Sequence, residues 1–303
     1  MPSSHTIALS AAQVDALRAR MESSGFEFRD VPYAVFGGAR PGVSVVVYEK
    51  GPKAVIQGKG ADEFVEFVIE PEILGEARMG YEDVLDPEMF EPHFGIDESG
   101  KGDFFGPLVI AGAYTDAESA RVLLDAGVAD SKSIGSDRRV RDLARSVRAC
   151  PGVETDVVVI APARYNELYE KFRNLNRLLA WGHARVIENL CERRPDCRRA
   201  VSDQFAREKR VVASALMERG RGLVLEQRTK AESDIAVAAA SVLARAAFVD
   251  WLDRASTDHA ILLPKGGGAQ ATAAARELVR RSGEGVLPNV AKMHFRNASR
   301  LTL

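Results

Sequence analysis

The stretch from residue 70 to residue 92 limits the folds open to this chain more than any other part of its sequence. Residues that interrupt helices and strands recur along it, at Pro71, Gly75, Gly80, Pro87 and Pro92. Residues 61–92 also hold 11 acidic side chains and one basic side chain, Arg78. This composition is typical of a solvated connection. We therefore expect two domains, residues 1–70 and 93–303, joined by an acidic linker over residues 71–92.

Charge is divided unevenly between these parts. The whole chain of 303 residues has a net charge of −2, which taken alone argues against non-specific binding to polyanions. Residues 1–92, however, hold 8 Lys and Arg against 16 Asp and Glu, whereas residues 93–303 hold 33 against 27. The second part thus carries a net charge of +6, and it can present a localised basic face.

The front part is predicted to be a small α+β unit. Apolar residues at helical spacing after Ser10 predict a helix over residues 10–24. Alternating apolar runs and a turn signal predict strands at Tyr33–Phe36, Val43–Tyr48 and Lys53–Gln57. A second helix is expected over Ala61–Ile69.

The rear part mixes strands and helices and is expected to be an α/β (α+β) domain with a mixed sheet. Strands are predicted from Ile96 onward, at Leu108–Tyr114, at Val157–Ala161, and near Arg199–Ser202 and Gly222–Glu226. Long helices are predicted at about Arg164–Glu192 and Ile235–Ala255.

Several protein classes are disfavoured. No apolar run reaches the ~18 residues of a membrane span, and the first residues do not resemble a secretory signal. Three cysteines are too few for a disulfide scaffold. We expect a cytoplasmic protein with reduced thiols.

Three acidic residues lie within seven positions of the glycine-rich segment Gly95–Leu108, namely Asp97, Glu98 and Asp103. Carboxylates gathered at a strand end commonly bind a cation, and oxygen-only ligation suits Mg²⁺ or Mn²⁺. Adjacent strand residues point to opposite faces, so Asp97 and Glu98 can share one site only if the strand ends or bulges near Gly100. Lys101 is placed to meet a phosphate.

Asp203 and Glu232 have comparable settings. Asp203 follows a short apolar run, and Glu232 precedes the apolar segment IAVAAASVLARAAF. An ordinary strand-end turn for Asp203 and a helix-dipole partner for Glu232 remain open alternatives.

The segment GIDESGKGDFFGPLVIAGAY resembles the first motif of the type 2 ribonucleases H, and specifically of ribonuclease HIII. Lys101 stands where ribonuclease HII more often has arginine. Further matches follow in order along nearly the whole chain: Asp130–Lys132, Tyr165–Leu168, Asn174–Leu190, Asp203–Phe205, Lys230–Ser233, Leu263–Gly266 and Ala291–Phe295. The front unit resembles the family's TATA-binding-protein-like domain through PYAVF and IQGKGADEFVEF.

The resemblance implies an RNase H-like catalytic domain that cleaves the RNA strand of RNA–DNA hybrids and leaves 5′-phosphates. It implies a site of four carboxylates, at Asp97, Glu98, Asp203 and Glu232, which hold two Mg²⁺ or Mn²⁺ ions. We expect Asp97 to contact both ions. Gly100, Lys101 and Gly102 are implied to contact substrate and to distinguish RNA through its 2′-hydroxyl. Ser131 and Lys132 are phosphate candidates, but Ser133 departs from a family pattern that often has lysine there.

The front unit is a candidate substrate-binding domain. Tyr33, Phe36 and Lys59 combine aromatic and basic groups, which can stack on bases or bind a nucleic-acid backbone. The alternative is that both rings fill the core of the sheet.

Two other functions remain open: incision at single ribonucleotides in duplex DNA, as in ribonuclease HII, and binding of hybrids without catalysis. We expect a monomer that binds an RNA–DNA hybrid, with no membrane and no obligate protein partner.

Overall fold

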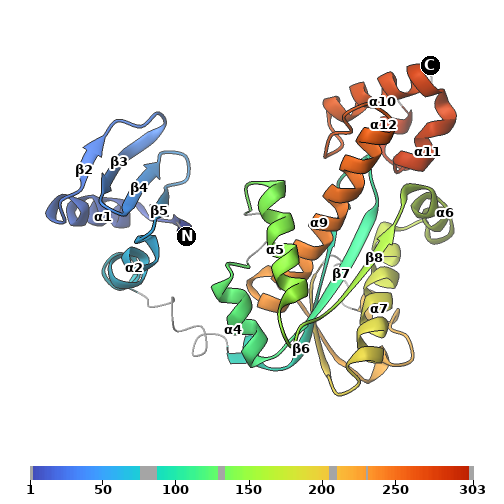
Figure 1. Cartoon of the computed structure of the whole chain (residues 1–303), viewed down its shortest axis with the longest axis horizontal. Coiled ribbons are helices and arrows are strands. Elements are labelled where there is room, and N and C mark those ends of the chain that lie inside the picture. The colour runs from blue at the N-terminus through green and yellow to red at the C-terminus, as the bar shows by residue number, and fades with distance from the viewer. Residues whose placement is uncertain (1–2, 76–86, 129–133, 205–209, 230, 300–303) are drawn as a thin grey trace. The chain divides into compact units, whose positions relative to one another are not determined.

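The structure is a computed structural model that describes residues 3–75, 87–128, 134–204, 210–229 and 231–299. The chain divides into two compact units, Met1–Pro87 and Glu88–Leu303. Figure 1 colours the first unit blue to cyan and the second green to red.

The first unit is a five-stranded antiparallel sheet in the order β1-β5-β4-β3-β2, packed against helices. Its strands are β1 (Ser3–Ala8), β2 (Glu27–Arg29), β3 (Ala34–Arg40), β4 (Val43–Tyr48) and β5 (Lys53–Gly58). The three predicted strands correspond to β3, β4 and β5, whereas the two edge strands were not predicted. Its likeness to a TATA-binding protein stays a prediction.

Two helical segments cover this sheet. Helix α1 (Ala11–Ser23) begins at Ser10, whose hydroxyl accepts from the Gln13 N–H while the Gln13 side chain accepts from the Ser10 N–H. Helix α2 (Ala61–Phe64) continues as the π-helical segment η1 (Val65–Leu74) and ends at Gly75. The buried faces of these helices and of the sheet form one apolar core.

The predicted linker over residues 71–92 is too long at both ends. Residues 71–74 continue the helical segment η1 of the first unit. The 3₁₀ segment η2 (Pro87–Phe90) places Met89 and Phe90 in the core of the second unit. Burial of these two apolar side chains explains why composition alone misplaced the boundary.

The second unit contains a mixed five-stranded sheet in the order β10-β9-β6-β7-β8. Its strands are β6 (His93–Ser99), β7 (Leu108–Thr115), β8 (Glu154–Ile160), β9 (Arg199–Asp203) and β10 (Val224–Arg228). Strands β6, β7 and β8 pair antiparallel, whereas β9 runs parallel to both β6 and β10. All five correspond to predicted strands.

Helices cover both faces of this sheet (Figure 1). One face packs against α4 (Ala117–Asp125), α5 (Asp137–Ala149) and α9 (Ile235–Asp258), and the other against α6 (Pro162–Phe172) and α7 (Leu175–Arg193). The remaining helical segments are α8 (Arg210–Ala213), η4 (Gly220–Gly222), η5 (Ala231–Ser233), α10 (Ala269–Ser282), η6 (Glu284–Val286), α11 (Leu287–Val290) and α12 (Arg296–Ser299).

The predicted helix over Arg164–Glu192 is two helices, because Arg173 adopts a left-handed conformation with φ of 47°. Asn174 then caps α7, since its side chain accepts from the N–H groups of Asn176 and Arg177.

Helix α9 is the central helix of the second unit. It approaches β6 so closely that a Cβ at Gly95 would lie 2.1 Å from the backbone carbon of Ala236. Helix α9 is long and apolar enough to cross a membrane, whereas the sequence was expected to hold no apolar run of that length. However, 78% of its most apolar stretch is buried inside the structure, as in the core helix of a globular protein.

Candidate active site

A cavity of about 340 Å³ opens at the end of β6. Its walls come from the end of β6, the glycine loop that follows, the last residue of β9, one face of α9, and Lys265. The residues that line it are Asp97, Glu98, Ser99, Gly100, Lys101, Gly102, Asp103, Asp203, Ser241, Arg245, Phe248, Val249 and Lys265. The cavity therefore brings together residues from three of the matched motifs, which lie more than a hundred and sixty positions apart in the sequence.

The glycine loop is held tightly although it is exposed in part. Gly100 has φ of 87°, and a Cβ there would lie 2.2 Å from the Pro107 carbonyl oxygen, so only glycine fits. Beneath the loop, the fully buried Lys292 donates from Nζ to the carbonyls of Asp103, Phe105 and Gly106, at 2.9, 3.3 and 2.6 Å. Burial lowers the pKa of this lysine to about 7.

Asp97 is buried on the side of β6 that faces α9. The Ser241 hydroxyl of α9 hydrogen-bonds its carboxylate. Burial, and next the negative charge of Glu98, raise the pKa of Asp97 to about 6. Because burial and Glu98 both disfavour the ionised form of Asp97, a cation bound beside its carboxylate would be stabilising.

Glu98 points to the opposite side of the strand, toward α7. Its carboxylate accepts from Nε2 of His183 at 3.0 Å and from Nζ of Lys101 at 2.7 Å. Burial acts to raise its pKa, but the hydrogen bond and charge of His183, together with Lys101, hold it at about 2. Glu98 is thus an ionised, fully partnered carboxylate.

Strand β6 ends at Ser99, directly before Gly100, as the sequence argument required, and it contains no bulge up to that point. Its pairing with β7 runs without interruption from His93–Thr115 to Ser99–Val109. Asp97 and Glu98 therefore face different helices, although both reach the cavity at the end of the strand.

Asp203 lies beside Asp97 rather than beside Glu98. Ile96 pairs with Ser202 across the parallel strands β6 and β9, so the next residues of the two strands, Asp97 and Asp203, share one face of the sheet. Glu232 lies in η5, half-buried just before α9, and is not part of the cavity wall. Within the described ranges, no three acidic, histidine or cysteine side chains converge into a metal-holding group.

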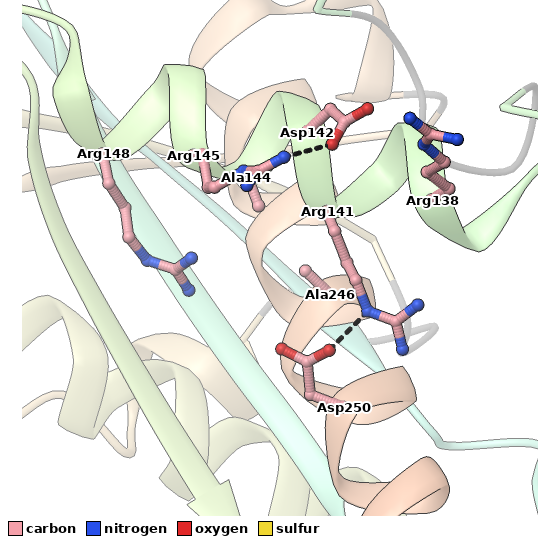
Figure 2. Close-up of a pocket in the computed structure, with 8 residues that line it drawn as sticks. All are labelled: Arg138, Arg141, Asp142, Ala144, Arg145, Arg148, Ala246 and Asp250. Carbon is pink, nitrogen blue, oxygen red and sulfur yellow. Dashed lines mark hydrogen bonds and ion pairs between the residues drawn. The ribbon is translucent and has the colours of Figure 1, made fainter.

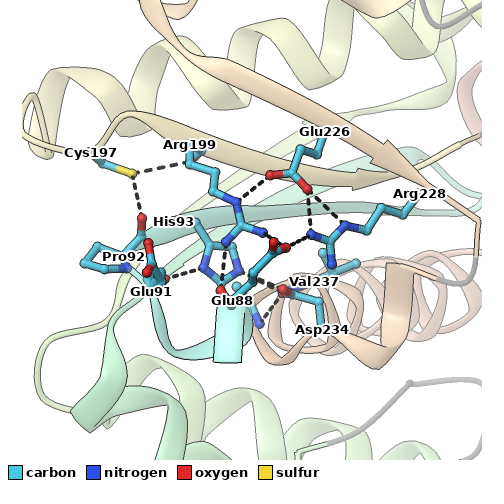
Figure 3. A network of polar contacts seen from close by, with 11 residues as sticks. Glu88, Glu91, Pro92, His93, Cys197, Arg199, Glu226, Arg228, Asp234 and Val237 are labelled. Atoms are coloured by element: carbon cyan, nitrogen blue, oxygen red, sulfur yellow. Dashed lines mark hydrogen bonds and ion pairs between the residues drawn. The ribbon is translucent and has the colours of Figure 1, made fainter. Parts of the chain in front are cut away.

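A buried polar network fixes the start of α9, next to Glu232 (Figure 3). The carboxylate of Asp234 caps α9 through the N–H groups of Ala236 and Val237. His93, at the start of β6, lies with Nε2 2.9 Å from Asp234 Oδ2 and Nδ1 2.6 Å from the Glu91 carbonyl. One imidazole thus ties the strand that carries Asp97 to the helix that follows Glu232.

The other predicted substrate contacts fall into three groups. Lys101 and Gly102 are exposed at the cavity, whereas Gly100 is buried. In the first unit, Tyr33 is 85% exposed and Lys59 is exposed, but Phe36 is 7% exposed and packs in the core. Phe36 was therefore wrongly expected to contact substrate. Ser131 and Lys132 lie outside the described residues.

Sequence reasoning missed four cavity or near-cavity groups, namely His183, Ser241, Arg245 and Lys265. His183 is fully buried in α7, and its bond to Glu98 joins residues 85 positions apart. Ser241 and Arg245 lie four residues apart on α9, so they share the face that lines the cavity. This spacing offered a signal for Ser241 and Arg245, whereas His183 and Lys265 lie inside the matched segments Asn174–Leu190 and Leu263–Gly266.

The comparisons with known proteins identify the family of this chain. The family model for ribonuclease HII matches residues 94–298, which contain the whole cavity. Ribonuclease HIII of Protochlamydia amoebophila is 44% identical over 276 residues, covering 91% of this chain and 89% of the relative. The chain belongs to the ribonuclease HIII family.

Further similarities extend over both units. Ribonuclease HIII of Chlamydia abortus is 41% identical over 281 residues, covering 92% of this chain and 91% of the relative. The crystal structure of Bst-RNase HIII in complex with Mn²⁺ is similar with a TM-score of 0.66 and 28% identity, and the match covers 99% of this chain and 98% of that one. The predicted RNase H-like mixed α/β fold of the ribonuclease HIII family is thereby confirmed.

Proposed function

We propose that this protein is an endoribonuclease that cleaves the RNA strand of RNA–DNA hybrids with Mg²⁺ or Mn²⁺. Membership of the ribonuclease HIII family supports the reaction class. The single observation that carries the proposal is the position of Asp97 and Asp203, each directly after the paired residues Ile96 and Ser202 of neighbouring parallel strands, at an open cavity lined also by lysine and arginine. The carboxylates of this cavity can bind metal ions, and its lysine and arginine side chains can bind phosphates.

The donor chemistry fits divalent metal ions. Asp97, Glu98, Asp203 and Glu232 are the residues that would hold them, and all their ligand atoms are carboxylate oxygens, as Mg²⁺ and Mn²⁺ prefer. Asp97 is buried with its pKa raised, so a bound cation would relieve its desolvation. Bound ions supply activation of a water molecule and stabilisation of the leaving oxygen.

The protein's own groups position the substrate. Gly100, Lys101 and Gly102 form a turn that allows a nucleic-acid backbone to approach the peptide groups closely, and Lys292 holds the segment that follows it through the carbonyls of Asp103 and Gly106. We assign to this turn the reading of the 2′-hydroxyl. Arg245 and Lys265 at the cavity wall are further phosphate contacts.

The first unit is the proposed substrate-binding domain. Tyr33 exposes most of its ring and adopts a positive φ of 64°, a conformation that costs energy in a residue other than glycine. With the exposed Lys59, it offers one stacking surface and one positive charge. A cytoplasmic, monomeric enzyme without an obligate protein partner completes the proposal.

One assay tests the function. A hybrid with a long RNA tract and a DNA duplex with one ribonucleotide are each offered with Mg²⁺, Mn²⁺ or chelator. Metal-dependent cutting of the hybrid, with 5′-phosphate products, is expected. Equal cutting of both substrates would favour a ribonuclease HII type of activity, and binding without cutting would reject catalysis.

A further inference from the structure

A second hollow, of about 380 Å³, lies between α5 and α9, and four arginines of α5 line it. Figure 2 shows Arg138, Arg141, Arg145 and Arg148 following one another along the helix. The intervals of three and four residues place them on one side of α5. At 1.5 Å per residue the row extends over about 15 Å.

The core does not require this row. Helix α5 buries Val140, Leu143, Ala144 and Val147 against the second unit's core. An exposed face that serves only for solubility commonly mixes both signs of charge, but α5 carries five arginines and two aspartates. The excess of arginine on α5 therefore indicates that this face binds negatively charged groups outside the helix.

The charges in the hollow are only partly compensated. Arg141 pairs with Asp250 and Asp253 of α9, and Arg145 pairs with Asp142 of its own helix. Arg138 and Arg148, at the two ends of the row, are exposed and form no ion pair or hydrogen bond with any part of the chain that the structure describes. Among the described residues, no group competes with an anion for these two guanidinium groups, and the pair of Arg145 with Asp142 is a surface pair that an anion can displace.

The row is continuous with the catalytic cavity. Asp137, the first residue of α5, accepts from Nζ of Lys265 at 2.6 Å and lies 3.7 Å from Nη2 of Arg245. Lys265 and Arg245 both line the catalytic cavity. Helix α9 is a wall of both hollows, since it contributes Ala246 and Asp250 to one and Ser241 and Phe248 to the other.

We propose that the arginine row of α5 binds the phosphate backbone of the nucleic acid held in the catalytic cavity, at phosphates outside the cleaved position. The proposal rests on the proposed function. Guanidinium groups bind phosphates through two parallel N–H bonds, so regularly spaced arginines match a chain of regularly spaced phosphates. A backbone leaving the cavity along α5 meets Arg138 first and Arg148 last.

The test is the double variant Arg138→Gln/Arg148→Gln in the full-length protein, because glutamine removes the charge and keeps a good helix former. Hybrid affinity is measured in chelator over a range of salt, and cleavage is measured separately at saturating substrate. A matched control is Arg276→Gln/Arg280→Gln on α10, which removes the same charge from two other exposed arginines.

We expect affinity for a long hybrid to fall about tenfold or more, and the slope of log affinity against log salt to fall by up to about 2. The maximal cleavage rate should stay within about twofold of wild type. Arg138→Lys/Arg148→Lys should retain most of the salt slope, and hybrids too short to extend beyond the cavity should show no loss.

Unchanged affinity for long hybrids would overturn the proposal and leave an acidic protein surface as the partner of the row. An equal loss in the α10 control, or an equal loss on short hybrids, would also overturn it. If the wild-type protein cuts no hybrid, the proposed function fails rather than the arginine-row proposal. The melting temperature of each variant shows separately whether it is folded.

Discussion

His183 Nε2 lies 3.0 Å from Glu98 Oε2, and the His183 ring is fully buried. An ionised carboxylate can only accept, so His183 donates its Nε2 proton to Glu98. The bond joins α7 to the end of β6 and fixes the direction of a carboxylate that the proposed function assigns to metal binding. His183 is therefore a positioning residue that acts through Glu98.

Replacing His183 with alanine should lower the cleavage rate at saturating substrate by about 10- to 100-fold, as for other groups that orient metal ligands. Hybrid affinity in chelator should remain within about twofold, because His183 lies beneath the cavity wall. Steady-state kinetics and a Mn²⁺ titration check both expectations.

His183→Gln should recover part of the activity, because an amide N–H can donate to Glu98 in place of the imidazole. Cys191→Ala removes another buried side chain from the same helix and core and serves as the packing control. Equal losses in Cys191→Ala and His183→Ala would mean that packing, not positioning, accounts for the effect.

Asp97→Asn should abolish cleavage while hybrid binding in chelator persists. It should also stabilise the metal-free protein at neutral pH. Burial raises the folded-state pKa of Asp97 to about 6, above its ordinary value of 3.8, so the wild type loses stability as pH rises from about 4 to 6. The difference approaches about 3 kcal/mol at most.

Urea unfolding of wild type and Asp97→Asn at pH 4 and pH 7.5, in chelator, measures this difference. The exposed Asp253 of α9 gives a control, since Asp253→Asn should show no such pH dependence. Adding Mn²⁺ should stabilise the wild type more than Asp97→Asn. Near-normal cleavage by Asp97→Asn would refute its assigned role.

The position of the acids along the chain was predictable from the sequence, but their orientation was not. A strand of seven residues that ends in Asp-Glu-Ser and is followed by Gly can be regular or bulged, and only its pairing with β7 decides between the two. The same holds for His183, whose partner Glu98 lies 85 residues away in the sequence. Contacts of this kind depend on packing between elements, which local patterns do not contain.

Two errors in the predicted helices and strands each have a local cause. The break between α6 and α7 depends on Arg173, a residue with no intrinsic preference for a left-handed conformation. Strand β1 lies at the edge of its sheet and alternates between half-buried and exposed residues, so it lacks the apolar run by which β4 and β7 were predicted.

Tyr33 and Phe36 should separate substrate binding from stability in the first unit. Tyr33→Ala should weaken hybrid binding by about 1–3 kcal/mol, the range for one stacked base, without lowering the melting temperature. Phe36→Ala should destabilise the unit by about 3 kcal/mol, because it empties a buried site in contact with Phe28. Fluorescence anisotropy and thermal melts of the same two variants distinguish these effects, and a Tyr33→Ala variant that binds as wild type would remove Tyr33 from the interface.

The buried Lys292 should make stability depend on pH in the alkaline range. Burial lowers its folded-state pKa to about 7 from an ordinary value of 10.5, so between these two pH values the unfolded chain binds more protons than the folded protein. The stability of the wild type relative to Lys292→Met should therefore rise with pH from 7 toward 10, by up to about 1.4 kcal/mol per pH unit. Urea unfolding of both proteins at pH 7, 8 and 9 measures the difference, and a flat or falling difference would show that the three carbonyls of the glycine loop keep the lysine charged throughout. The cleavage rate of the two proteins measures the effect on the glycine loop separately from stability. Lys292→Met leaves the carbonyls of Asp103, Phe105 and Gly106 without the Nζ donor that holds the loop.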